Sequence, residues 1–321
     1  MLLLLKKNKY RLYIGGMETA MKKTGKKKVS KMKRREYLVG YACALPAIIG
    51  VIALMVVPIC YVIYISMTRW TAISSPKWIG LENYKKIFTD VYMYRSLFVT
   101  VKYAVGAILF SLLYAFGLAL MLNTNIRGKT LFRSIFFLPN VMPAIGVTIL
   151  WSWIYNADFG LMNSFTSIFG AGKSLWIYGE KTAIVSLWIM AVWVSGNYII
   201  IFLAGLQGVP QSLIEAVAID GGNAFHKLIY VTIPMVTPTI FFNFLMGMIN
   251  HLQNFIPVYA ITQGGPNNAT LFTVYYLVRE AFTRNNFGYA SAIAVVFFVV
   301  ISIITAIVFI TSKKWVYYGG E

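Results

Sequence analysis

Charged residues are scarce in this 321-residue chain, and acidic residues are the scarcest. Only 12% of the residues are charged, with 10 Asp and Glu against 29 Lys and Arg, whereas 59% are hydrophobic and the mean hydropathy is +0.69. This composition excludes a soluble globular domain and a disordered chain. It predicts an integral membrane protein.

Cysteine and histidine are also rare, with two of each. Cys43 and Cys60 lie in one apolar stretch, where a helical rise of 1.5 Å per residue separates them by about 25 Å, so they cannot form a disulfide with each other. His226 and His251 have no Cys or His neighbours at metal-ligand spacing. We therefore expect no metal site, no redox site and no catalytic residue on this chain.

Long apolar stretches determine the predicted fold class. A helix needs about 20 residues to cross about 30 Å of hydrocarbon. Six stretches are long enough, namely 38–67, 97–122, 134–155, 182–207, 236–262 and 290–311. They are too long for the strands of a membrane barrel. The sequence predicts an all-α integral membrane protein with six transmembrane helices, in which residues 37–68 form the first helix and residues 95–312 contain the other five.

Lys and Arg are distributed unevenly between the two sides of these spans. Six spans place both termini on one side, and 19 of the 29 basic residues fall there, 13 of them in the tail 1–36. Because cytoplasmic segments retain positive charge, the tails 1–36 and 313–321 and the loop 208–235 are predicted to be cytoplasmic. We interpret the basic tail as an orientation signal that contacts anionic membrane lipid, and we expect no nucleic acid partner.

None of the six spans has Asp, Glu, Lys or Arg near its middle. Such groups cost about 2.5–3.5 kcal/mol to insert and usually mark an ion or proton path, so their absence argues against a proton- or sodium-coupled carrier. Amides and aromatic rings in the fifth and fourth spans suit a neutral, hydroxyl-rich ligand such as a sugar. The candidate substrate-binding residues are Asn250, His251, Asn254, Trp193, Ser195, Asn197 and Tyr198. Amides and hydroxyls also join membrane helices to one another, and this alternative stays open for each residue.

The connection between the fourth and fifth spans is polar and contains its own helix start and stop signals. Ser212 and Glu215 have the S-x-x-E spacing of a capping box, and Gly221 and Gly222 end the short helix that follows. A rigid helix of this kind, lying along the membrane, can insert into a groove on another subunit. We therefore expect a docking element, with an ordinary re-entrant connection as the alternative.

Two short segments imitate the end of a phosphate-binding loop. They are Gly172-Lys173-Ser174 and Gly128-Lys129-Thr130, but Ser167 and Asn123 stand where the leading glycine of such a loop belongs. We therefore expect no ATPase site on this chain, and energy for any transport has to come from a separate subunit.

The polar connection resembles the EAA loop of the permease subunits of binding-protein-dependent ABC importers. That pattern, E-A-A-x-x-D-G-A followed by I-x-L-P, is matched by Glu215, Ala216, Asp220, Gly221 and Pro234, with Val217 and Gly222 in place of two alanines. In the family this loop is the coupling helix that seats in the nucleotide-binding subunit. The resemblance implies the type I (MetI-like) permease fold with a cytoplasmic coupling helix, and coupling residues Glu215, Ala216, Asp220, Gly221, Gly222 and Phe225.

Other segments resemble the carbohydrate-uptake branch of this family, and together they span nearly the whole chain. They are Gly80-Leu81-Glu82-Asn83-Tyr84, Phe132–Pro139, Thr262-Gln263-Gly264-Gly265-Pro266 and Gly288–Ala292. The nearest resemblance is to the larger maltose permease subunit type. In that type, sugar contacts fall on the positions of His251 and Asn254 and near Ser195, Asn197 and Tyr198. His251 stands where that pattern has asparagine, and the large outer insertion of that subunit is missing.

The resemblance implies an ATP-driven importer of a sugar or oligosaccharide that works by alternating access, in the plasma membrane of a prokaryote. The implied partners are a second, unlike permease subunit, two ABC ATPase subunits that bind ATP and Mg, and an extracytoplasmic solute-binding protein, with no cofactor on this chain. One alternative is an importer of amino acids or another small solute. The other is a membrane-embedded enzyme, which would need mid-membrane carboxylates or a histidine–metal pair.

Overall fold

The computed structural model describes residues 31–71, 73–124 and 127–317, and the chain divides into two compact units, Met1–Tyr61 and Val62–Glu321. Most of the predicted tail 1–36, and the end of the predicted tail 313–321, lie outside the described residues. Helix α2 already begins at Lys31, so the last residues of the predicted basic tail are helical.

The described part of the first unit is a helix that continues into the second unit and has few buried residues. Helix α2 (Lys31–Val51), the π-helical turn η1 (Ile52–Val56) and α3 (Val57–Ser66) run on without interruption. In its most apolar window only 6% of the residues are buried inside the chain. Such a surface is stable only against lipid or another apolar helix.

The second unit starts within α3, at Val62, and continues with a small antiparallel ribbon and then helices. The ribbon pairs β1 (Thr68–Arg69) with β2 (Lys77–Trp78). The helical elements are α4 (Glu82–Ile87), α5 (Val91–Leu122), α6 (Lys129–Val141), α7 (Ala144–Ile154), α8 (Leu161–Ser167), η2 (Trp176–Tyr178), α9 (Ala183–Trp193), α10 (Gly196–Gln207), α11 (Gln211–Ile219), α12 (Ala224–Lys227), η3 (Leu228–Thr232), α13 (Ile233–Leu252), η4 (Val258–Thr262), α14 (Thr273–Val278), η5 (Arg279–Thr283) and α15 (Phe287–Ser312).

Six membrane spans can be counted among the described residues. Four are continuous helices, Met32–Ser66, Val91–Leu122, Ala224–Leu252 and Phe287–Ser312. The other two are helix pairs with a sharp bend, α6 with α7 at 99° and α9 with α10 at 48°. When each bent pair is taken as one span, the prediction of an all-α, six-span membrane protein is confirmed.

Local sequence explains both bends. Met142 and Pro143 have extended backbone conformations between α6 and α7, as expected where proline restricts the preceding residue and donates no hydrogen bond. At the second bend Gly196 packs directly on α6, and a Cβ there would lie 2.4 Å from the carbonyl oxygen of Phe136. The close approach of α10 to α6 therefore requires glycine at this position.

The fifth span differs from its predicted limits of 236–262. The continuous helix begins at Ala224, passes through the π-helical turn η3 and ends at Leu252. The wide turn η3 directly precedes Pro234, so the ring and its missing N–H are accommodated without a break. Residues 253–255 then interrupt the helix before the helical segment that leads into η4, which places Asn254 in a loop and not on the helix.

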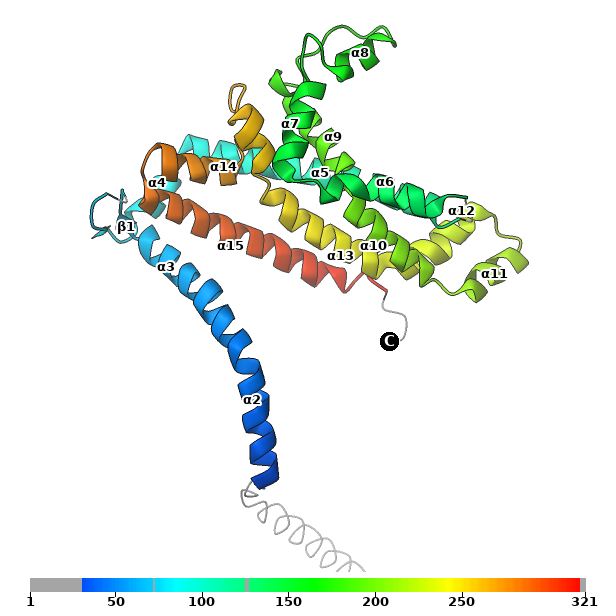
Figure 1. Ribbon diagram of the computed structural model, residues 1–321, viewed down its shortest axis with the longest axis horizontal. Coiled ribbons are helices and arrows are strands. Elements are labelled where there is room, and N and C mark those ends of the chain that lie inside the picture. The colour runs from blue at the N-terminus through cyan, green and yellow to red at the C-terminus, as the bar shows by residue number, and fades with distance from the viewer. Residues whose placement is uncertain (1–30, 72, 125–126, 318–321) are drawn as a thin grey trace, which may run out of the picture. The chain divides into compact units, whose positions relative to one another are not determined.

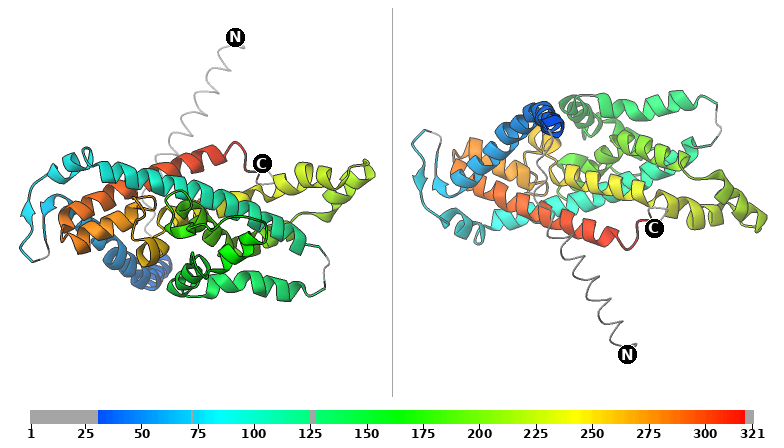
Figure 2. Two further views of the ribbon diagram at one scale, coloured as in Figure 1. Left: turned by 90° about the horizontal axis from the view of Figure 1, so that it is seen from above. Right: turned by 90° about the horizontal axis from the view of Figure 1, so that it is seen from below.

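Helix α5 lies at the centre of the second unit, where it packs against α9, α10 and α13. Figure 1 shows β1 and α4 at one end of this unit and α11 and α12 at the other, and the two views of Figure 2 agree. Helices α7, α8 and α9 form an arm that leaves the side of the bundle (Figure 1). The two ends of the unit thus carry the hairpin and the predicted docking loop respectively.

Candidate functional site

A cavity of about 330 Å³ lies where three helix breaks meet. Met142 lines it at the bend between α6 and α7, Val194 at the bend between α9 and α10, and Asn254 in the loop after α13. Broken helices in a membrane are tolerated where the freed backbone groups are buried in protein or line a cavity. The convergence of three breaks on one cavity is therefore the feature of this fold that best fits a binding site.

The polar groups of the cavity are uncharged. The described residues that line it include neither Asp, Glu, Lys nor Arg, and their polar side chains are Tyr103, Asn140, Thr148, Tyr198, Asn250, His251 and Asn254. Apolar side chains such as Met142, Leu187 and Met190 complete the wall. Ligand sites of this type are mostly apolar with a few convergent polar groups. Hydroxyl, amide and imidazole groups on such a wall can bind a neutral ligand through hydrogen bonds.

Tyr103 organises one corner of the cavity. Its side chain is only 1% exposed, its hydroxyl accepts a hydrogen bond from the Asn254 amide at 2.6 Å, and its ring meets the His251 ring edge-on with 5.9 Å between centroids. The same ring also packs on Phe272, with centroids 4.6 Å apart. One residue of α5 thus positions both polar residues at the end of α13.

His251 has an unsatisfied hydrogen-bonding atom. Its Nε2 is buried and has no partner among the described residues, although its residue lines the cavity. A buried polar atom without a partner costs about 1–3 kcal/mol, so natural structures rarely retain one without a reason. A ligand hydroxyl in the cavity would supply the missing partner.

The structure brings together four of the seven residues that the sequence suggested for substrate binding. Asn250, His251, Asn254 and Tyr198 line the same cavity, and the Tyr198 hydroxyl is a hydrogen-bond partner of the Asn250 side chain. These four come from α10, α13 and the loop that follows, so the two suspected spans do meet.

The other three candidates lie elsewhere. Trp193 packs edge-on against Trp151 in the aromatic core, with ring centroids 5.8 Å apart. Ser195 is buried and donates to the carbonyl oxygen of Val192 at 2.7 Å, which helps to end α9. Asn197 is exposed and does not line the cavity. None of these three is among the residues that line the cavity, although Val194 between them is, and their role in substrate binding stays a prediction.

Sequence reasoning missed Tyr103, Asn140, Met142 and Thr148. Tyr103 belongs to a long apolar helix whose pattern shows no break, and tyrosine is common in such helices. The segment from Asn140 to Pro143 carries a signal, since proline preceded by an amide within an apolar stretch marks a broken helix. Reading this segment as a break would have placed Asn140 and Met142 at the cavity.

Helices α5 and α9 are locked together next to the cavity. The Trp188 indole donates to the carbonyl oxygen of Tyr103 at 2.9 Å, and its ring fills the space beside Gly106. A Cβ at Gly106 would lie 2.2 Å from the ring. This contact requires glycine at position 106 and fixes the wall that carries Tyr103.

The predicted docking loop is a helical element that none of the described residues buries. Helix α11 ends at Ile219, α12 begins at Ala224, and neither contains a buried residue. Large apolar side chains are exposed on it, including Ile219 at 86% and Phe225 at 65%. Glu215, Ala216, Asp220 and Gly221 are exposed as well. An exposed apolar surface on a rigid element indicates a contact with another protein.

The helix start in this loop differs from the prediction. Ser212 does not cap α11, because the helix begins one residue earlier, at Gln211, and Pro210 occupies the cap position without a side-chain bond. Proline fixes its own φ near the helical value and needs no donor there. The capping box belongs instead to α12, where Asn223 accepts from the backbone N–H of His226 and the His226 ring bonds the Asn223 N–H.

The helix stop agrees with the prediction, and it explains one departure from the EAA pattern. Gly221 has φ +78° and donates to the carbonyl oxygen of Ala218, while Gly222 donates to that of Val217 at 2.8 Å, which together form a Schellman motif. A Cβ at Gly222 would lie 2.4 Å from Cγ1 of Val217. Valine at 217 and glycine at 222, the two replacements of alanine, are therefore matched to each other.

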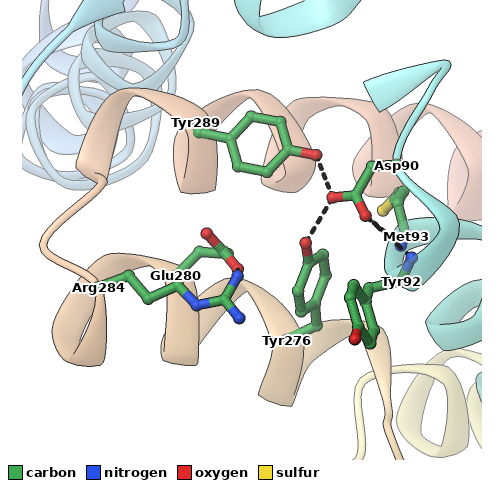
Figure 3. Close-up of polar contacts among 7 residues, drawn as sticks. All are labelled: Asp90, Tyr92, Met93, Tyr276, Glu280, Arg284 and Tyr289. Atoms are coloured by element: carbon green, nitrogen blue, oxygen red, sulfur yellow. Dashed lines mark hydrogen bonds and ion pairs between the residues drawn. The ribbon is translucent and has the colours of Figure 1, made fainter. Parts of the chain in front are cut away.

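A second polar cluster lies at the opposite end of the unit. Asp90 caps α5 by accepting from the backbone N–H groups of Tyr92 and Met93, and it accepts from the hydroxyls of Tyr276 and Tyr289 at 2.5 Å each (Figure 3). Burial acts to raise the pKa of Asp90, but these hydrogen bonds outweigh it and hold the pKa below its usual value. The cluster ties α5, α14 and α15 together.

Comparison with known proteins identifies the family. Residues 107–316 match the family described as binding-protein-dependent transport system inner membrane component. The chain is 37% identical, over 92% of its length and 96% of the relative's, to the probable ABC transporter permease protein YesP of Bacillus subtilis. This chain belongs to that family. The ABC importer permeases are membrane components of transport systems, and the type I fold inferred from the EAA loop is confirmed.

Two further relatives of this ABC permease carry names that refer to sugars. The trehalose/maltose transport permease MalF of Thermococcus litoralis is 30% identical over 85% of the chain and 92% of the relative. The multiple sugar-binding transport permease MsmF of Streptococcus mutans is 30% identical over 78% of the chain and 87% of the relative.

Solved structures show the same fold. A chain of a bacterial ABC transporter that imports the acidic polysaccharide alginate superposes with a TM-score of 0.73 at 20% identity, covering 88% of this permease and 98% of that chain. A second structure of an alginate transporter, in complex with a periplasmic protein that holds an alginate pentasaccharide, gives a TM-score of 0.75 at 19% identity.

Proposed function

We propose that this permease moves a neutral sugar or short oligosaccharide into the cell, and that the cavity at the three helix breaks is its translocation site. The observation that carries the proposal is the convergence of Tyr103, His251 and Asn254 on an uncharged cavity beside broken helices. Sugars suit such a wall, because their hydroxyls bond amides and imidazole while their ring faces pack on aromatic and apolar side chains. The relatives named for trehalose, maltose and multiple sugars support this substrate class.

The chain supplies the path, and separate subunits supply the energy. Two ABC ATPase subunits, which bind ATP and Mg, receive the loop 208–235 of this permease and of a second, unlike permease subunit. Glu215, Ala216, Asp220, Gly221, Gly222 and Phe225 form the coupling surface. Closure of the ATPases on ATP moves the coupling helices and opens the cavity outward, and hydrolysis resets it. The exposed loop, which none of the described residues buries, supports this division of labour.

The proposed orientation places the coupling loop and both termini in the cytoplasm of a prokaryote and the β1–β2 hairpin outside. The excess of Lys and Arg on the side of the termini supports it. A solute-binding protein then delivers the sugar to the outer end of the permease, as a periplasmic protein is seen bound in the alginate transporter.

The test is sugar-dependent ATP hydrolysis by the complex purified through this chain and reconstituted in nanodiscs. Binding protein loaded from a panel of neutral sugars, acidic sugars and amino acids is added, and the ATPase rate is measured. We expect stimulation by one or a few neutral sugars. Stimulation by an amino acid alone would overturn the substrate class, and a complex that contains no ATPase would overturn the coupling role.

Gly221→Pro provides an uncoupled control. Its φ of +78° is closed to proline, whose ring holds φ near −65°, so the end of α11 should be deformed while the spans remain inserted. We expect the variant to assemble in the membrane but to lose stimulation by sugar. Normal sugar uptake by this variant would show that the loop does not couple.

A further inference from the structure

A polar crevice of about 510 Å³ opens at the end of the second unit that carries the hairpin. It is formed where β1, the residue after β2, helix α4 and the turn before α15 meet, far from the coupling loop (Figure 1). Three cations line it, Arg69, Lys86 and Arg284, against one carboxylate, Glu82. The translocation cavity shares none of these residues.

The three cations are held in different ways. Arg69 pairs with Glu82 at 3.2 Å, and both side chains remain more than half exposed. Arg284 pairs with the buried carboxylate of Glu280 and keeps half of its side chain exposed (Figure 3). The Lys86 ammonium has no carboxylate partner among the described residues and lies over the Tyr289 ring, 4.0 Å from its centroid. The Lys86 side chain is exposed, so its charge is available to a further ligand.

The walls of the crevice are preorganised. The Asn83 amide donates to the carbonyl oxygens of Ser66 and Thr68 at 2.8 and 2.9 Å, which fixes α4 to the hairpin. A Cβ at Gly288 would lie 2.0 Å from the Thr68 carbonyl oxygen, so α15 starts in direct contact with the hairpin. Tyr289, beneath Lys86, is held by its hydrogen bond to Asp90 (Figure 3).

The segments that surround the crevice also carry a net positive charge. Segments 69–95 and 279–284 contain seven Lys and Arg residues and three Asp and Glu residues. Two of these acids are already engaged, Asp90 by two tyrosines and Glu280 by Arg284. An acidic surface that approached this end would be attracted and steered to the crevice.

We propose that this crevice receives acidic side chains of the sugar-loaded binding protein and so fixes the position in which that protein delivers its ligand. The inference rests on the proposed function, which requires a binding protein at this end of the permease. Cations that reach one recess from three separate segments match a projecting Asp or Glu. Anionic lipid headgroups are instead collected by basic tails and amphipathic helices that lie along the surface.

Charge reversal in the crevice tests the proposal. Lys86→Glu and Arg69→Glu are compared with Lys173→Glu, which makes the same charge change on an exposed outer loop outside the crevice. Each complex is reconstituted in nanodiscs of neutral phosphatidylcholine, and the Kd for sugar-loaded binding protein is measured at low and high salt. We expect the crevice variants to weaken binding about tenfold at low salt and less at high salt, with Lys173→Glu close to wild type.

A second measurement separates docking from misfolding. Acidic residues on the binding protein are changed to Lys one at a time, and one of these changes should restore tight binding to the Lys86→Glu complex while weakening binding to wild type. A folding defect in the permease could not be repaired from the partner.

The outcomes distinguish a failure of the crevice from a failure of the proposed function. A wild-type complex that no sugar-loaded binding protein stimulates would refute the proposed function itself. Stimulation of the wild type together with unchanged Kd values for both crevice variants would refute the crevice alone. A loss that appears only in nanodiscs with anionic lipid, and vanishes in phosphatidylcholine, would identify a headgroup site and also overturn the inference.

Discussion

The Asn254 amide donates a hydrogen bond to the Tyr103 hydroxyl across 2.6 Å, and thereby joins the loop after α13 to the buried face of α5. The two residues are 151 positions apart in the chain. This bond closes one corner of the translocation cavity, and the hydroxyl and amide that form it are the groups a sugar would meet there.

Tyr103→Phe should show whether the Tyr103 hydroxyl contributes to sugar binding, because the substitution keeps the packing of the ring. The phenyl ring keeps the contact with Phe272, so the variant should assemble with a stability loss of about 1 kcal/mol for one hydrogen bond. We expect either the concentration of sugar-loaded binding protein needed for half-maximal ATPase stimulation to rise about tenfold or the maximal rate to fall about tenfold. The reason is that a site built to bond hydroxyls is sensitive to a missing polar group. Tyr155→Phe is the matched control, since the buried Tyr155 donates to Ser186 at 2.8 Å outside the cavity. Equal effects of the two substitutions on sugar dependence would contradict the assignment.

His251→Phe should raise stability while it lowers transport. The substitution removes a buried Nε2 atom that has no partner, and relief of that cost is worth about 1 kcal/mol. Thermal unfolding of the purified complex and the rate of sugar-stimulated ATP hydrolysis are measured on the same sample. A fall in stability with unchanged stimulation would assign His251 to packing alone.

Gly222→Ala should weaken coupling, and Val217→Ala should restore it. The added methyl group would lie 2.4 Å from Cγ1 of Val217, which is impossible without a shift of the helix end, whereas alanine at 217 removes that atom. A double-mutant cycle on sugar-stimulated ATPase should give an interaction free energy of about 1 kcal/mol or more. Additive effects would mean that the two replacements of alanine are independent.

Asp90→Asn should destabilise the permease in a pH-dependent manner. Hydrogen bonds hold the pKa of Asp90 below its usual value, so its contribution is complete above the unfolded pKa of about 3.9 and is lost as the pH falls through the lower folded value. The difference in unfolding free energy between wild type and Asp90→Asn should be constant from pH 5 to pH 7, at about 2 kcal/mol, and should shrink below about pH 4. A difference that grew on acidification would have the wrong sign for a depressed pKa.

Much of this architecture follows from local sequence. The six spans follow from hydropathy, and the end of α11 follows from Gly221 and Gly222, because the left-handed position of a Schellman motif favours glycine. The start of α11 was misassigned because Ser212 and Asn223 both have a residue three positions on that can complete a cap. Pro210 in fact starts α11 without any side-chain acceptor, and the Asn223 cap belongs to the next helix, α12.

The cavity was harder to predict from the sequence, because the hydropathy of a span does not show where its helix bends. Met142 and Pro143 keep the third span apolar although the backbone turns by 99° there. Trp193, Ser195 and Asn197 lie within five residues of one another, yet the bend at the end of α9 sends them to the core, to a helix end and to the surface. Tyr103 reaches the cavity through tertiary packing on Phe272, which no local pattern encodes.

The indole of Trp188 beside Gly106 has a mechanical consequence. A ring that leaves no room for even one carbon atom at the neighbouring position prevents α5 and α9 from sliding past each other, because interlocked cores shift in discrete steps and do not deform continuously. Helices α5 and α9 should therefore move as one rigid body during the transport cycle. Rotation of the helices must then take place where the helical hydrogen bonds are already interrupted, at residues 142–143 and 194–195. The hinges of the transport movement are therefore the same helix breaks that line the cavity.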